Sequence, residues 1–267
     1  MRTAGDPRGA DHAHPGRRAL GWAVHVYTAG GSVLALLAVL AAVAGHTVEA
    51  FWVLLAALVV DGTDGMLARR LGVAQAIPGF DGGRLDDIVD YLTYVFAPVV
   101  LLLTSGRLPA GPWGVALAAL PLLASCIQFC RTDAKTDDHY FLGFPSYWNV
   151  VAFYAVVLDL SPVVVSVVLV TCAVLVFVPV KYLYPSRTPV LRVLNLSLAG
   201  LWLVLYAVIL AGMPDPNPLA LGLSLAYLAY YAAASVLLTS LDRFRRVVPQ
   251  LDQDPDQSSS VASTSRM

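Results

Sequence analysis

The sequence has little charge: only 13% of its 267 residues are Asp, Glu, Lys or Arg, whereas a soluble globular domain has about 25%. Its three cysteines all lie inside apolar runs, and their odd number argues against a disulfide framework or a zinc site. The chain also lacks the period-two alternation of a membrane β-barrel. Hydrophobic residues, in contrast, make up 58% of it. The composition therefore predicts an integral membrane protein built from helices.

Apolar segments long enough to span a bilayer occur eight times. A spanning helix needs roughly 20 mostly apolar residues, and turn-forming Pro and Gly residues separate the segments. We therefore expect an all-α, polytopic membrane helix bundle of about eight transmembrane helices, at 21–45, 48–71, 85–105, 112–132, 146–160, 162–183, 191–212 and 217–241. The polar residues 1–19 and 244–267 are predicted to be disordered, which leaves 20–243 as one membrane domain.

Lys and Arg are unevenly distributed between the two ends of these segments. With the N-terminus inside the cell, all of the 17 basic residues except Arg107 fall on the cytoplasmic side. Cytoplasmic loops of membrane proteins carry such an excess of positive charge. Both termini are therefore predicted to be cytoplasmic.

Four acidic residues lie near the cytoplasmic ends of the second and third predicted spans: Asp61, Asp64, Asp86 and Asp90. The first two have i, i+3 spacing and the last two i, i+4 spacing, so each pair lies on one helix face. Two neighbouring antiparallel helices can then direct all four carboxylates to one point. Because unpaired acids inside a membrane are costly, we predict a bound hard divalent cation, Mn²⁺ or Mg²⁺.

Small and basic residues flank these acids. Gly65 and Gly82 leave room for a substrate to approach the backbone, and Arg69 supplies a positive charge for a phosphate. An alternative is that the acids only pair with the neighbouring arginines. Asp87 lies off the face of the second acidic pair, so it is expected to be solvated or to support its neighbours.

These residues form a pattern that resembles the signature of the CDP-alcohol phosphatidyltransferase superfamily. The pattern reads Asp61-x-x-Asp64-Gly65-x-x-Ala68-Arg69 and, twelve residues later, Gly82-x-x-x-Asp86-x-x-x-Asp90. The segment between its two halves is longer than in many members. The resemblance implies that the four aspartates hold Mn²⁺ or Mg²⁺ and that Asp90 acts as the general base. It also implies that CDP-diacylglycerol is bound by Gly65, Ala68, Arg69 and Gly82.

Three further stretches resemble the bacterial phosphatidylcholine synthases within that superfamily: LDDIVDYLTYVFAP (85–98), RTDAKTDDHYFLGFPSYWNVV (131–151) and KYLYPSRTPVLRVLNL (181–196). The likeness covers roughly residues 20–240. It implies a transferase that condenses CDP-diacylglycerol with choline to give phosphatidylcholine and CMP. It further implies a multi-pass protein of the bacterial inner (plasma) membrane, with its active site facing the cytoplasm, and a homodimer.

Choline carries a quaternary ammonium group, which aromatic faces bind well. The aromatic residues predicted to contact it are Tyr91, Tyr94, Tyr147 and Trp148. An alternative is that these side chains only belong to the aromatic belt at the membrane interface. The expected partners are the two substrates and membrane lipids, with no nucleic acid.

Two other functions remain open at this point. The same superfamily reaction with serine, inositol or glycerol phosphate as acceptor would want a dedicated basic pocket for an anionic acceptor. A divalent-cation transporter would instead distribute acids over several depths of the bilayer, whereas here they occupy one level. No Ser-His or Cys-His arrangement occurs near the acids, which favours direct displacement over a covalent intermediate.

Overall fold

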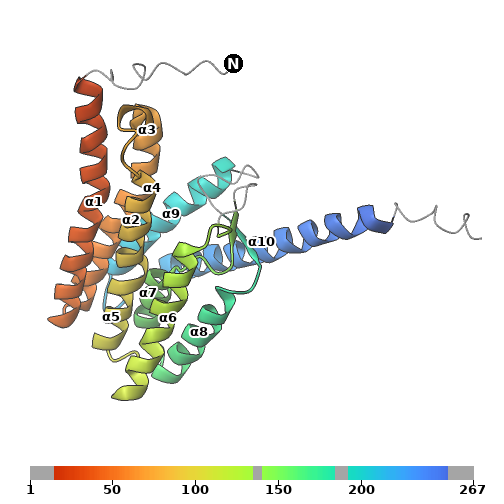
Figure 1. Ribbon diagram of the computed structural model, residues 1–267. Coiled ribbons are helices and arrows are strands. Elements are labelled where there is room, and N and C mark those ends of the chain that lie inside the picture. Colours follow the sequence, from red (N-terminus) through yellow and green to blue (C-terminus); the bar gives the residue numbers. More distant parts are fainter. Residues whose placement is uncertain (1–14, 135–139, 184–191, 252–267) are drawn as a thin grey trace, which may run out of the picture.

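The computed structural model describes residues 15–134, 140–183 and 192–251, with side chains up to residue 240. These residues form a helical bundle with one small sheet (Figure 1). The helices are α1 (Pro15–Val43), α2 (Thr47–Leu71), α3 (Val73–Ala76), α4 (Gly82–Asp90), the π-helix η2 (Tyr91–Phe96), α5 (Ala97–Thr104), α6 (Pro112–Cys130), α7 (Trp148–Val157), α8 (Pro162–Leu175), α9 (Arg192–Ala211) and α10 (Pro218–Leu251). The strands are β1 (Tyr140–Leu142) and β2 (Lys181–Leu183).

Six helical stretches of the described chain are long and apolar enough to cross a membrane, by length and composition. They are Pro15–Val43, Thr47–Leu71, Gly82–Thr104, Pro112–Cys130, Arg192–Ala211 and Pro218–Ser240. The third stretch joins α4, η2 and α5 end to end. The prediction of a polytopic helical membrane protein is therefore confirmed.

The fifth and sixth predicted spans correspond to the shorter apolar helices α7 and α8. Their 10 and 14 residues rise only about 15 and 21 Å, less than the roughly 30 Å of a hydrocarbon core. α8 ends at Leu175 rather than at residue 183, because Pro179 cannot continue a helix and residues 181–183 pair with another strand. The predicted boundary of the sixth span is therefore corrected.

The first and last helices extend beyond the residues predicted for the membrane domain. α1 begins at Pro15 rather than at residue 20 or 21, since proline is well suited to the first turn of a helix. α10 continues to Leu251, past residue 243, through arginines that favour helix. The rest of the segments predicted to be disordered, 1–14 and 252–267, lies outside the described residues.

The short helix α7 lies in the centre of the bundle. Its Trp148 and Phe153 are fully buried. Phe153 stacks on Tyr206 of α9 with ring centroids 3.8 Å apart, and Phe51 of α2 meets it edge-on at 5.6 Å. The core thus joins α2, α7 and α9, and it buries a helix that is too short to span a membrane alone.

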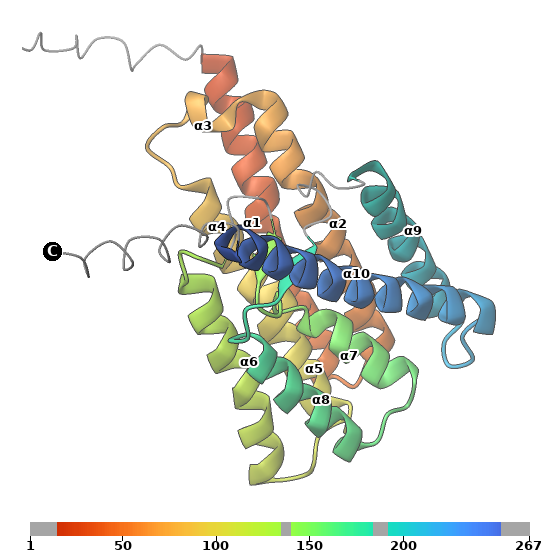
Figure 2. The same cartoon turned by 90° about the vertical axis from the view of Figure 1, so that its right-hand side faces the viewer.

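The two strands and α10 close the other side of the bundle. β1 pairs antiparallel with β2, with Phe141 opposite Tyr182. The Thr239 hydroxyl of α10 accepts a hydrogen bond of 2.8 Å from the backbone N–H of Lys181 in β2. In both views α10 runs across the bundle at a steep angle to α1 and α2 (Figures 1 and 2). This crossing brings the middle of α10 towards the helices that carry the acidic residues.

Candidate active site

Capping residues fix the end of α2 and the start of α4. α2 ends at Gly72, whose positive φ of 62° suits glycine, and the Gly72 N–H donates to the carbonyls of Ala68 and Arg69. α4 begins after Asp81, whose carboxylate accepts a hydrogen bond of 3.0 Å from the backbone N–H of Arg84. The caps thereby set where the acidic faces of the two helices begin and end.

Three of the four predicted acidic residues come together. Carboxylate oxygens of Asp61 on α2 and of Asp86 and Asp90 on α4 all lie within 4.8 Å of one another. The three residues are half-buried. A set of carboxylate oxygens at this separation suits a hard divalent cation such as Mg²⁺ or Mn²⁺. The donor chemistry of the group therefore fits the metal that the sequence predicts.

Asp64 is not one of this group of three. Its side chain is only 4% exposed, and its carboxylate faces the Thr28 hydroxyl of α1, the backbone N–H of Gly65 and the Arg69 guanidinium. In this arrangement Asp64 links α2 to α1 and holds Arg69 nearby. A direct role for Asp64 in binding metal stays a prediction.

A cavity of about 740 Å³ opens beside the acidic group. Its lining includes most of the predicted site: Asp61, Asp64, Gly65, Ala68, Arg69, Gly82 and Asp86. The volume lies in the range of small-molecule binding sites, about 300–1,000 Å³. The residues predicted to bind CDP-diacylglycerol thus share one cavity with Asp61, Asp64 and Asp86, whereas Asp90 joins the acidic group without being a lining residue.

The two predicted glycines each lie close to another side chain. A Cβ atom on Gly65 would lie 3.1 Å from Nη1 of Arg69, one turn further along α2. A Cβ atom on Gly82 would lie 3.0 Å from Cε1 of His25. The glycines therefore leave room for the Arg69 guanidinium and the His25 ring at the cavity wall.

The four predicted aromatic residues fall into two groups. Tyr94 and Tyr147 line the cavity, and the Tyr94 hydroxyl donates a hydrogen bond of 2.5 Å to Oδ2 of Asp61. Tyr91 and Trp148 do not line it. The Tyr91 hydroxyl donates to the carbonyl of Leu122 at 3.2 Å, and the Trp148 ring is fully buried in the core.

Besides Phe80, the sequence analysis missed the cavity residues Trp202 of α9 and Tyr227 and Tyr231 of α10. The rings of α9 and α10 continue a row that starts at Tyr94. Successive centroids lie 5.9 Å apart for Tyr94–Tyr147, 6.3 Å for Tyr147–Tyr231, 6.5 Å for Tyr231–Tyr227 and 6.2 Å for Tyr227–Trp202. The i, i+4 spacing of the two α10 tyrosines was a signal in the sequence, although only the fold reveals which helix they face.

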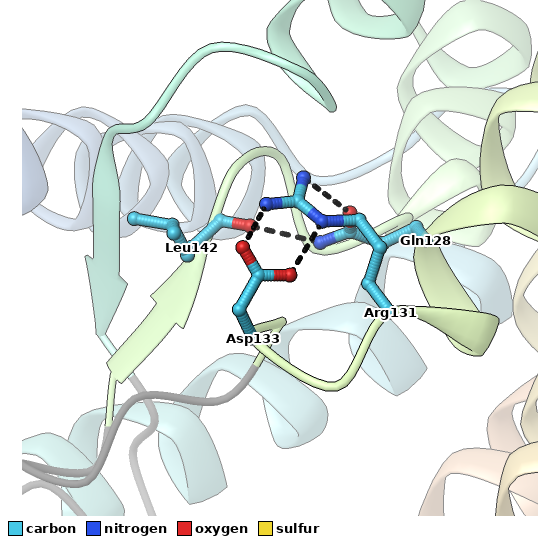
Figure 3. Close-up of polar contacts among 4 residues, drawn as sticks. All are labelled: Gln128, Arg131, Asp133 and Leu142. Atoms are coloured by element: carbon cyan, nitrogen blue, oxygen red, sulfur yellow. Dashed lines mark hydrogen bonds and ion pairs between the residues drawn. The ribbon is translucent and has the colours of Figure 1, made fainter.

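Asp87 lies in a different, smaller pocket beside the end of α6, with Gln128 and Arg131. Figure 3 shows that Arg131 binds the Asp133 carboxylate through two nitrogens, at 2.8 and 2.7 Å, while Gln128 donates to the Leu142 carbonyl of β1 at 2.9 Å. The hydrogen bonds from Arg131 hold the pKa of Asp133 below its usual value. These contacts tie the end of α6 to the small sheet.

Comparisons with known proteins match most of the chain. The family model for CDP-alcohol phosphatidyltransferase matches residues 26–179. A phosphatidylcholine synthase of Legionella pneumophila is 37% identical over 240 residues, which cover 87% of this chain and 94% of that relative. Proteins of the same name are 40% identical in Pseudomonas aeruginosa, over 81% of this chain and 91% of the relative, and 33% identical in Borreliella burgdorferi, over 85% and 97%.

Proposed function

The chain belongs to the CDP-alcohol phosphatidyltransferase family, and on this premise we propose that it condenses CDP-diacylglycerol with choline to give phosphatidylcholine and CMP. The observation that carries the proposal is one cavity lined by Asp61 and Asp86 of the acidic group, by Arg69 and by a row of aromatic rings. Carboxylates that hold a divalent cation, together with Arg69, suit an anionic diphosphate. Aromatic rings suit a cationic alcohol. The names of relatives that align over more than four-fifths of the chain support the same reaction.

The carboxylates are assigned to the diphosphate end of the substrate. Asp61, Asp86 and Asp90 would hold Mn²⁺ or Mg²⁺, with Asp64 adjacent on α2. When bound, such a cation neutralises charge on the diphosphate and on the departing CMP. Arg69, which the missing side chain of Gly65 accommodates, supplies a further positive charge for phosphate.

Asp90 is assigned as the general base. It takes the proton of the choline hydroxyl while the hydroxyl oxygen forms a bond to the phosphorus that carries diacylglycerol. The bond between that phosphorus and the oxygen leading to CMP breaks, and CMP leaves with the electron pair. Proton, phosphatidyl group and leaving group are thus accounted for without a covalent enzyme intermediate.

Choline is assigned to the aromatic side of the cavity. Tyr94 and Tyr147 are retained from the predicted set, and Tyr231 lies next in the row. Faces of aromatic rings attract a quaternary ammonium group within about 6 Å of their centroids. Tyr94 also touches Asp61 through its hydroxyl, so the same side chain borders both halves of the site.

The positive-inside pattern supports a further part of the proposal: eight crossings, both termini in the cytoplasm, and a site that faces the cytoplasm from the bacterial inner membrane. α7 and α8 would then cross only where neighbouring helices cover them. A homodimer is proposed from the family resemblance.

The alternatives remain another alcohol acceptor or a divalent-cation transporter. Among the described residues, aromatic rings rather than added basic side chains line the acceptor side of the cavity, which favours choline over glycerol phosphate. Transport would need acids at several depths, whereas Asp61, Asp86 and Asp90 form one group.

The test is CMP release by purified protein supplied with CDP-diacylglycerol, Mn²⁺ and choline, serine, inositol or glycerol phosphate in turn. We expect release with choline alone, together with formation of phosphatidylcholine. Release with another alcohol in place of choline would change the assigned acceptor. No CMP with any alcohol would contradict the phosphatidyltransferase.

A further inference from the structure

His25 lines the cavity and carries a buried nitrogen without a hydrogen-bond partner among the described residues. The residue lies on α1, is only 7% exposed, and lines the same space as Asp61 and Gly82. Its Nε2 atom has no hydrogen-bond partner among the described residues. Since buried polar atoms are nearly always hydrogen-bonded, a ligand in the cavity is a natural partner for this nitrogen.

Neighbouring residues hold the His25 ring in place. Its centroid lies 4.2 Å from that of Phe80 and 5.8 Å from that of Trp22, which sits one turn earlier on α1. On the side of Cε1, the ring fills the space that a side chain on Gly82 would need. The ring is therefore packed between α1 and the start of α4, and its nitrogen has a defined position.

The surroundings of His25 differ from those of the acidic group. Thr28, one turn further along α1, faces Asp64, and Gly82 precedes Asp86 by one turn of α4. His25 thus lies beside the carboxylates but is packed against aromatic rings. The charged diphosphate belongs with the carboxylates and Arg69, so a neutral part of the same ligand fits the side of His25.

We propose that His25 binds the cytidine of CDP-diacylglycerol through a hydrogen bond at Nε2. A neutral imidazole nitrogen either donates or accepts one such bond, and both the base and the ribose of cytidine offer neutral groups to meet it. This role rests on the proposed function and adds a specificity-determining residue outside the acidic motif. It also gives Gly82 a physical reason: the glycine lets the ring lie against the nucleotide site.

The test compares nucleotide affinity in the purified full-length protein and in His25→Phe, which keeps a ring of similar size and removes both nitrogens. By isothermal titration with Mn²⁺ present, we expect the Kd for CMP to rise about five- to tenfold, the loss of one hydrogen bond. The Kd for inorganic pyrophosphate should not change. In the enzyme assay, KM for CDP-diacylglycerol should rise while KM for choline stays the same.

Two further variants sharpen the result. His46→Gln changes an exposed histidine at the start of α2 that pairs with Glu49, and it should bind CMP like the wild type. His25→Gln restores a polar atom near the position of Nε2, so it should bind CMP more tightly than His25→Phe.

Wild-type affinity for CMP in His25→Phe would overturn the inference, as would equal affinities of the two His25 variants. An equal loss of pyrophosphate binding would also overturn it, because the effect would then not concern cytidine. If the wild-type protein neither binds CMP nor releases it, the proposed function itself fails.

Comparison of 2′-deoxy-CMP and UMP with CMP identifies the group of cytidine that His25 contacts. The loss of affinity caused by His25→Phe should vanish for the analogue that lacks the contacted group.

Discussion

Among single residues, Asp90 is the one assigned as the general base. It is the last residue of α4, directly before the π-helix η2, and its carboxylate belongs to the group with Asp61 and Asp86. π-Helical turns are rare and frequently occur at functional sites. The change from α- to π-helix at this point therefore coincides with the residue that is assigned to accept the proton.

Asp90→Asn keeps the shape of the side chain but removes its capacity to accept a proton. We expect kcat for CMP release to fall by about a hundred- to ten-thousand-fold, with binding of CDP-diacylglycerol largely intact. Steady-state kinetics and equilibrium binding of the lipid measure the two effects separately. If lipid binding is lost together with turnover, Asp90 acts chiefly as a metal ligand.

Tyr147 tests the choline side of the cavity. Tyr147→Leu removes an aromatic face next to Tyr94, so KM for choline should rise about two- to thirtyfold, with KM for CDP-diacylglycerol unchanged. Tyr230→Leu is the matched control, because Tyr230 is not part of the cavity lining and its hydroxyl hydrogen-bonds Asn195. Equal effects of the two variants would show that the aromatic row does not select choline.

The sequence could predict most acidic residues but fewer of the aromatic ones, and helix geometry explains this. Carboxylates at i, i+4 spacing near a membrane boundary form a local pattern. Tyr91, in contrast, directly follows Asp90 in the chain, and Trp148 directly follows Tyr147, which lines the cavity. Adjacent residues on a helix point about 100° apart. Tyr94, at i+4 from Asp90, therefore lies nearer the face of Asp90 than Tyr91 does.

At the scale of elements, local periodicity predicted the long helices and failed where non-local contacts decide. The pairing of β1 with β2 joins residues about 40 positions apart, and no local pattern indicates it. The same pairing ends the sixth predicted span early. Tyr227 and Tyr231 reach the cavity only because α10 crosses the bundle, which a sequence of apolar residues does not reveal.

Asp133→Asn tests the support of the contact that joins α6 to the sheet: Asp133 holds Arg131, whose Nη1 donates to Gln128 at 3.4 Å, and Gln128 donates to the Leu142 carbonyl of β1. The variant loses the charge of the bidentate contact with Arg131, so the amides of β1 should exchange hydrogen faster. The pKa of Asp133 is lowered in the folded protein, so its contribution to stability is fully present above the usual value of 3.8 and is lost as pH falls through the lower, folded value.

Hydrogen exchange of wild type and Asp133→Asn, corrected for the intrinsic pH dependence, should therefore differ by the same factor from pH 5 to pH 8. A difference that disappears already at pH 5 would contradict the lowered pKa. No difference at any pH would mean that the Arg131–Asp133 pair does not restrain the sheet.

At the scale of the whole molecule, composition alone predicted the membrane class, but the number of crossings depends on α7, α8 and α10. Reporter fusions test the proposed topology. Alkaline phosphatase fused after Gly111 should be active, because the loop with Arg107 is predicted to be outside, and fusions at either terminus should be inactive. An active fusion at the C-terminus would mean that α10 lies across the bundle without completing the last crossing.

The central claim is that the carboxylates of Asp61, Asp86 and Asp90 hold a divalent cation that the transfer to choline requires. The most direct measurement is choline-dependent CMP release by protein stripped of divalent ions with a chelator and then titrated with Mn²⁺ or Mg²⁺. We predict no release in the stripped protein and a saturable return with added cation, and no return in Asp61→Asn with Asp86→Asn. A full rate of choline-dependent CMP release in the stripped protein would contradict the account.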